Sequence, residues 1–310
     1  MSNLNANDPN LIMSPLADPV TSAIFANVET AGEAAGSIIR ATLKASGDNE
    51  LLGKIVEVTP QRTHTSPKER GCRVDVDTKS DANENVIFEI QLNPDMHIIT
   101  RDLFSAAHIF TKTSTRGDTS AQMALKMPRV IYINILGYNI REDNSALVQP
   151  FKIMYTNPPS RVAVHHFSGY NIQLPRILEM PPNFEDSLYC WCYTLYTAHL
   201  KGITIQEVLA VQPALQTYSE QDMGFSQFCD RYNQVCADPA TRDEYVRWTI
   251  DQMRQEGERA WIRQEAITEG RIEIAINMIH DGDDVHKISR ITGLESSRIF
   301  ELKNELKASG

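Results

Sequence analysis

The segment VIFEIQL at residues 86–92 alternates between apolar and polar positions with the two-residue period of a β-strand. Successive side chains of a strand point to opposite faces, so Val86, Phe88, Ile90 and Leu92 should share one face and Ile87 the other. Glu89 and Gln91 would then lie side by side on the other face. An edge strand with one wet face and a buried catalytic strand with two polar groups in a cleft both fit this pattern.

Apolar spacing before and after this segment predicts an alternation of helices and strands. The expected elements are a helix at 18–44, strands at 51–58, 72–78 and 86–92, a helix at 99–112 and a strand at 129–136. The helices are predicted from apolar residues three and four positions apart. The last strand is predicted from a continuous apolar run, which is typical of a strand covered on both faces. The order indicates an α/β fold with a mixed sheet, in which the second and third strands form a hairpin around the turn-like DANEN.

The second half of the chain is predicted to become purely helical near residue 216. The expected elements are a strand at 162–166, a helix at 187–200, a long helix at 256–279 and two short helices at 285–292 and 296–306. The first 15 residues are polar and rich in Asn, which is typical of disorder. The predicted domains are therefore a disordered tail at 1–15, an α/β domain at 16–215, and a helical region at 216–310 with a long helix and a short helical hairpin.

The charge of the chain is unevenly distributed. The 310 residues carry a net charge of −10, but residues 61–130 contain ten Lys and Arg against nine Asp and Glu, which leaves −10 − 1 = −11 for the rest. The overall balance argues against a protein held on nucleic acid by bulk charge, because such proteins usually show a basic domain or stripe. A local basic surface around the predicted hairpin remains compatible with these numbers.

Cysteine usage and hydropathy indicate where the protein works. The five cysteines are an odd number without a CxxC pair, the N-terminus does not resemble a secretory signal, and no apolar run approaches the roughly 18 residues of a membrane span. These features predict a cytoplasmic protein with reduced thiols and no membrane contact.

The predicted hairpin brings acidic side chains together. In RVDVD, strand alternation places Arg73, Asp75 and Asp77 on one face, and pairing with the next strand brings Asp75 close to Glu89. Two carboxylates that converge on a covered sheet repel each other and are costly to bury. A divalent cation removes that cost, and Mg²⁺ prefers one or two carboxylates together with waters and phosphate oxygens. A solvated hairpin face is the alternative that alternation alone leaves open.

The order of Asp75, Glu89 and Gln91 across a hairpin, followed by a helix and a strand, resembles the PD-(D/E)XK nuclease superfamily. Gln91 stands where most of that superfamily has lysine. The chain is most similar to one branch, the recombination-promoting nuclease and putative transposase family of bacteria. The LDV-like strand, the I-E-[MIV]-Q strand and the following arginine of that family are similar to VDV, FEIQ and Arg101 here.

Other segments extend the resemblance to about nine tenths of the chain. They are DPVTSAIF at 18–25, VIYINILGYNI at 130–140, IQLPRI at 172–177, DSLYCWCYTL at 186–195 and the helical tail beginning EGRIEIAINMI. Each motif is short, so their order carries the resemblance.

The resemblance implies a restriction-endonuclease-like core with a mixed central sheet flanked by helices. It further implies a metal-dependent endonuclease that hydrolyses phosphodiester bonds of double-stranded DNA in recombination or transposition. Asp75 and Glu89 would hold Mg²⁺, or Mn²⁺ in its place, and Gln91 would orient the attacking water. Arg101, Lys68 and Lys79 are candidates for DNA contact.

The uncharged Gln91 leaves a second interpretation open. A catalytically weak or inactive module of the same fold would bind DNA or a protein partner without cutting. In either case the C-terminal helices are candidates for assembly into a homo-oligomer.

Overall fold

The computed structural model describes residues 5–27, 29–48, 52–61, 63–64, 72–113, 115–140, 146–158 and 161–309, with only the backbone for 63–64, 72–73 and 307–309. The chain divides into two compact units, Met1–Val246 and Arg247–Gly310.

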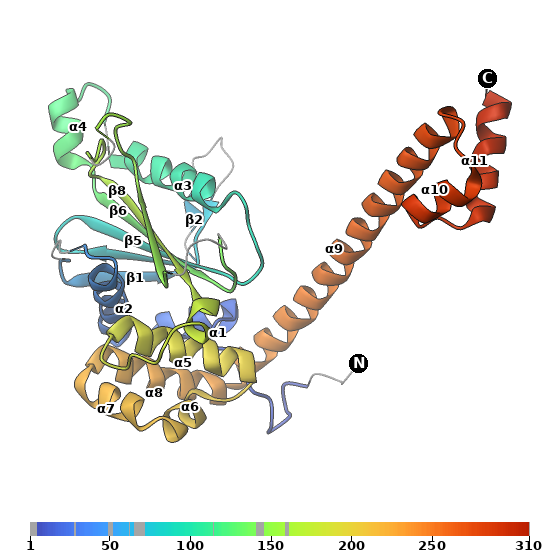
Figure 1. The fold of residues 1–310 in the computed structure, drawn as a ribbon. Helices are drawn as coiled ribbons and strands as arrows, with labels where there is room; N and C mark the ends of the chain where they lie inside the picture. The colour runs from blue at the N-terminus through green and yellow to red at the C-terminus, as the bar shows by residue number, and fades with distance from the viewer. Residues whose placement is uncertain are drawn as a thin grey trace. The chain divides into compact units, whose positions relative to one another are not determined.

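The first unit is built on a mixed six-stranded sheet (Figure 1). Its strands are β1 (Ile55–Pro60), β4 (Val76–Ser80), β5 (Glu84–Gln91), β6 (Arg129–Leu136), β8 (Phe167–Gln173) and β7 (Val148–Lys152), in that spatial order. β5, β6 and β8 run parallel, and β1, β4 and β7 add antiparallel edges. A short ladder of β2 (Thr63–His64) and β3 (Cys72–Arg73) stands apart from this sheet. The predicted α/β fold with a mixed central sheet is therefore confirmed.

Helices cover both faces of the sheet. The helices of the first unit are α1 (Asp18–Phe25), α2 (Ala31–Ala45), α3 (Ile98–Thr113), α4 (Ser120–Lys126), the 3₁₀ helix η1 (Leu174–Leu178), α5 (Ser187–Lys201), α6 (Ile205–Val211), α7 (Pro213–Gln221) and α8 (Met223–Ala237). Helix α3 lies on one face, where its Ala106 and Ile109 pack on Ile87 and Tyr132 of the sheet (Figure 1). Helices α1, α2, α5 and α8 lie on the opposite side.

Successive side chains of β5 point to opposite faces of the sheet, as the alternation predicts. Phe88 stacks on Phe25 of α1 with ring centroids 6.1 Å apart, and Phe25 in turn contacts Phe228 of α8. Ile87, one residue earlier, points to the α3 face. The strand is thus buried on both sides, which rules out the edge strand with one wet face.

Several predicted boundaries were wrong for local reasons. The single helix expected at 18–44 is two helices, because the Asn27 carboxamide oxygen accepts hydrogen bonds from the N–H groups of Glu29 and Thr30 and forms a turn that competes with the helix. Residues 162–166 do not form the expected strand, and Val162 makes only an isolated bridge to Met154. The strand in this region is β8, which begins at Phe167.

The start of the chain also departs from prediction. Residues 1–15 were expected to be disordered, and residues 1–4 of them lie outside the described residues. Met13 is nevertheless fully buried, and its carbonyl accepts a hydrogen bond from Tyr232 of α8. The Ser14 hydroxyl and the His199 imidazole of α5 lie 2.8 Å apart in a further hydrogen bond. Composition predicted disorder because a polar local sequence carries no record of contacts with residues far along the chain.

Helix α9 (Pro239–His280) begins in the first unit and continues into the second, which ends with α10 (Val285–Thr292) and α11 (Ser296–Ser309). Asp284 caps α10 by accepting from the N–H of Lys287, and Gly293 ends it with a positive φ of 70°. The division between units falls later than the predicted domain boundary at 215/216, because α7 and α8 pack with the first unit. No helix among the described residues is both long and apolar enough to span a membrane.

Candidate active site

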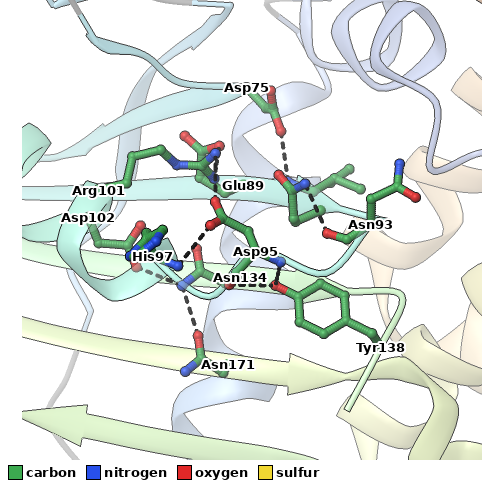
Figure 2. Close-up of polar contacts among 12 residues, drawn as sticks. Asp75, Glu89, Asn93, Asp95, His97, Arg101, Asp102, Asn134, Tyr138 and Asn171 are labelled. Atoms are coloured by element: carbon green, nitrogen blue, oxygen red, sulfur yellow. Dashed lines mark hydrogen bonds and ion pairs between the residues drawn. The ribbon is translucent and has the colours of Figure 1, made fainter. Parts of the chain in front are cut away.

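A row of polar side chains crosses the sheet beneath α3. Glu89 of β5 is in register with Asn134 of β6, and Asn134 is in register with Asn171 of β8. Register partners on neighbouring strands share a face, so the three side chains line up on the side that α3 covers (Figure 2). All three residues are buried, next to the apolar cluster that contains Ile87, Tyr132 and Phe167 on the same side of the sheet.

Asp75 reaches this row through a bend in the backbone. The strand predicted at 72–78 is interrupted at Val74 and Asp75, which separate β3 from β4, and the ladder between β4 and β5 ends at the pair Val76 and Phe88. Beyond that pair, the N–H of Ile90 donates to Asp75 Oδ2 at 2.7 Å. The carboxylate thus occupies the place of a backbone carbonyl at the end of the ladder and is held against the residue that follows Glu89.

The bend corrects the predicted alternation in this segment. Val74, expected on the face opposite the aspartates, packs in the same apolar cluster as Ile87. Asp77 is the register partner of Ile87, so it lies on that face too, and its carboxylate accepts from the Asn85 carboxamide at 3.3 Å. Strict alternation therefore does not run through Asp75, and Asp77 is placed with Asn85 rather than with Glu89.

Arg101 of α3 lies between two carboxylates. Its guanidinium is 3.3 Å from Glu89 Oε2 and 3.5 Å from Asp95 Oδ2 (Figure 2). The Arg101 side chain is 37 % exposed whereas that of Glu89 is 9 % exposed, so the cation faces outward over the buried acid. One side of the guanidinium therefore remains open to an anion that approaches from solvent.

Glu89 is in an unfavourable environment for a negative charge. Burial raises its pKa well above the usual value, and the nearby Asp75 carboxylate raises it further. Arg101 acts in the opposite direction, while the carboxylates of Asp102 and of Asp18, at the start of α1, add to the rise. The site thus concentrates negative charge that one partly exposed arginine offsets incompletely.

Asp102 joins the row from the helix side. The Asn134 amide donates to Asp102 Oδ2 at 2.7 Å and to Asn171 Oδ1 at 2.9 Å, which links helix α3 to two central strands. Burial raises the pKa of Asp102 to about 7, although the hydrogen bond from Asn134 lowers it. This network fixes the position of α3 over the sheet and so fixes Arg101.

The remaining predicted site residues differ in where the structure places them. Gln91 follows Glu89 on the same face of β5, and its amide donates to the Asn93 carbonyl at 3.0 Å. Lys79 pairs with Glu57 of β1 at 2.7 Å, near the opposite end of β4 from Asp75. The structure therefore does not bring Lys79 to the two carboxylates. Lys68 lies outside the described residues.

Sequence reasoning missed Asp102, Asn134 and Asn171. One signal was present for Asn134, which is the only amide in the apolar run RVIYINIL. A single polar residue in a strand that is buried on both faces needs a hydrogen-bonding partner, and such partners gather at functional sites. Nothing local marks Asp102, because it follows a charged residue on a helix with a partly exposed face.

The residues present fit a divalent cation of the Mg²⁺ type. Asp75, in the break between β3 and β4, and Glu89 of β5 offer carboxylate oxygens, and a cation between them would offset the burial and the repulsion that raise the Glu89 pKa. Among the described residues no three His, Cys, Asp or Glu side chains gather as a ready-made metal cage. A pair of carboxylates is what Mg²⁺ commonly uses when waters and phosphate oxygens complete its coordination.

A mixed sheet that carries acidic residues on a hairpin next to a parallel strand pair, with helices on both faces, defines a nuclease-like α/β fold of the PD-(D/E)XK class. Residues 31–247 match the family model described as PD-(D/E)XK nuclease family transposase, and the chain belongs to that family. No curated protein and no solved structure matches the chain. The matched region contains Asp75, Glu89, Gln91 and Arg101, while the resemblance at 18–25 and in the helical tail lies outside it.

Proposed function

We propose that this protein is a metal-dependent endonuclease that hydrolyses phosphodiester bonds of double-stranded DNA, with Asp75 and Glu89 as ligands of Mg²⁺ or Mn²⁺. The observation that carries the proposal is the approach of the half-buried Asp75 to the buried Glu89, where burial and then the like charge of Asp75 raise the pKa of Glu89. Family membership supports a nuclease activity linked to transposition.

Each side chain of the site has a role in this proposal. A cation bound by Asp75 and Glu89 would supply a water of lowered pKa and neutralise charge on the scissile phosphate. The Gln91 amide, on the same face of β5 as Glu89, would hold the attacking water by hydrogen bonding, without contributing charge. The exposed side of the Arg101 guanidinium would bind a phosphate oxygen of the DNA backbone, since guanidinium groups match phosphate geometry.

The setting follows from the same reasoning. On the basis of the family, we propose a role in bacterial DNA recombination or in the movement of a mobile element. Free cysteines such as Cys190 and Cys192, which are buried as thiols, support a location in the cytoplasm. We also propose Lys68 and Lys79 as DNA contacts, Lys79 at the end of β4 far from Asp75.

The second candidate is a module of the same fold that binds DNA or protein without cutting. The observation that favours it is Gln91, whose amide carries no charge where most of the superfamily has lysine and is engaged with the Asn93 carbonyl. Under this proposal the wild-type protein retards duplex DNA in a gel at metal concentrations that give no cutting.

Nicking of supercoiled plasmid tests the endonuclease proposal. The wild type should relax plasmid with Mg²⁺ or Mn²⁺ and lose this activity in EDTA, and Asp75→Ala should lower the initial rate by about a thousandfold because one cation ligand is gone. Glu220→Ala, which removes an exposed acid on α7, serves as the control and should cut like the wild type. The proposal is contradicted if wild type and Asp75→Ala cut equally, or if the wild type does not cut with either cation.

Gln91→Lys is expected to keep or raise the nicking rate. A lysine at this position would place a positive charge beside the scissile phosphate, while Gln91→Leu, of similar size, should lower the rate roughly tenfold to hundredfold because it cannot hold a water. Initial rates of the two variants under one metal condition provide the comparison. If Gln91→Lys falls to the level of Gln91→Leu, Gln91 does not stand in for the family lysine.

A further inference from the structure

Helix α9 carries an exposed apolar stripe along the second unit. Ile250, Met253, Ile267 and Ile274 are 51, 57, 45 and 48 % exposed. With Gly257, Ala260, Gln264 and Arg271 they occupy positions alternately three and four residues apart, the spacing of a coiled-coil seam. The stripe is therefore a helix face with the geometry of an interface.

The small core of the second unit covers only the far end of this helix. Ala275 of α9 is fully buried against Ile288 of α10 and Ile299 of α11, and the neighbouring apolar residues of α9 that join this cluster begin at Ile272. Residues 253–267 are exposed around the whole helix circumference. A helix without tertiary packing is marginal in water, so a partner on the apolar stripe would stabilise it.

We propose that α9 pairs with the same helix of a second copy of this chain, in antiparallel orientation about a two-fold axis near residues 258 and 259. Stacking the stripe against its antiparallel copy places Ile250 against Ile267 of the second copy and Gly257 against Ala260. The small residues at the centre allow close approach of the two helices, and the two isoleucine layers close the seam on either side.

Charged residues beside the stripe favour the proposed antiparallel register over registers shifted by seven residues. Glu256 and Arg263 both flank the stripe on the same side, one residue before a seam position, and both are exposed. In the proposed register each Glu256 lies beside Arg263 of the other copy, which gives two symmetric ion pairs. A slip of seven residues in one direction sets Glu256 against Glu256, and in the other direction Arg263 against Arg263. These repulsions disfavour the neighbouring registers.

A parallel pairing lacks this complementarity. It would set Arg271, which falls on a seam position, directly against Arg271 of the other copy, and it would place Glu256 beside Trp261 rather than beside a cation. The like charges at the seam and the lost ion pairs favour the antiparallel dimer.

The test uses two charge reversals in the full chain, Glu256→Lys and Arg263→Glu. Each variant alone brings like charges together twice, so its dimer dissociation constant in sedimentation velocity should rise at least roughly tenfold over the wild type. Mixed in equal amounts, the two variants should form a heterodimer, because positions 256 and 263 then carry opposite charges at both contacts between the copies. Differently tagged variants should therefore co-purify with each other and not with themselves.

Matched controls separate pairing from helix stability. Glu258→Lys and Arg259→Glu make the same charge changes on neighbouring residues that face away from the stripe, and these variants should dimerise like the wild type. Circular dichroism checks that every variant keeps its helix content. A monomeric wild type at micromolar concentration, single variants that dimerise like the wild type, or a mixture that does not assemble would each overturn the proposal.

Discussion

Glu89→Gln should abolish plasmid cutting and at the same time make the metal-free protein more stable. The expected loss of nicking is about a thousandfold or more, because an amide is a much poorer cation ligand than a carboxylate. The expected gain in the free energy of unfolding at neutral pH is on the order of 1 kcal/mol or more, since the substitution removes a carboxyl group whose ionised form is disfavoured by burial and by Asp75. A substitution that lowers the nicking rate and raises the free energy of unfolding identifies a residue whose role is in catalysis rather than in folding.

The gain in stability should depend on pH in a defined direction. The pKa of Glu89 is raised in the folded protein, so the folded state binds more protons than the unfolded state between the usual and the raised value. Stability contributed by this group is therefore present in acid and lost as pH rises through the folded pKa. The difference between Glu89→Gln and wild type should shrink as the pH is lowered toward the usual glutamate pKa.

Urea unfolding in EDTA at several pH values, followed by circular dichroism, measures this difference. Added Mg²⁺ should stabilise the wild type and leave Glu89→Gln nearly unchanged, because a cation bound to the folded state shifts the unfolding equilibrium. A variant that is less stable than the wild type at neutral pH would contradict the view that Glu89 is a strained, charge-repelled acid.

Gly224→Ala should destabilise the first unit by about 1–3 kcal/mol, a typical cost of overpacking a tight contact. A Cβ at Gly224 of α8 would collide with the Glu33 carbonyl oxygen and come within 2.6 Å of Ser37 Cβ on α2. The first contact is with backbone, which cannot rotate away. The two helices must separate, and the hydrogen bond from Ser37 to Asp222, 2.8 Å long, lies at this junction.

Gly270→Ala provides the matched control for this substitution. Gly270 lies within α9, where an added Cβ meets no atom within 4 Å, so alanine should stabilise the helix by about 0.5–1 kcal/mol through its higher helix propensity. The same chemical change is thus expected to have opposite signs at the two positions. Thermal unfolding by circular dichroism checks both, and a Gly224→Ala protein that melts at or above the wild-type temperature would show that α2 and α8 accommodate the methyl group.

Hydrophobic periodicity was sufficient to predict the elements whose buried faces show directly in their own local pattern of apolar residues. The alternation in β5 placed Phe88 and Glu89 on opposite faces, and the apolar run RVIYINIL predicted β6 with the bounds that the structure has. Both predictions were accurate because burial of an entire strand face leaves a local record in the sequence.

Elements that depend on distant partners were not predictable in the same way. β8, with the sequence FSGYNIQ, contains Ser, Gly and Asn and does not look like a buried strand, yet all seven residues are buried and Asn171 is hydrogen-bonded to Asn134. The bend at Asp75 is a second case, since its carboxylate is held by the N–H of Ile90, a residue on another strand. The candidate site was therefore predictable in its two carboxylates and not in the network that positions them.

The packing of α8 on α1 and α2 has a consequence for synthesis of the chain. The residues of the carboxylate pair leave the ribosome early, but Phe228, which covers Phe25 and thereby the face of Phe88, is translated about 140 residues later than Phe88. Until then the cover that α1 gives to this face lacks its packing against α8, and the first unit cannot complete its fold. A chain released before α8 would therefore leave Phe25 without its Phe228 contact and expose apolar surface, which is the kind of surface that makes an unfinished chain prone to aggregation.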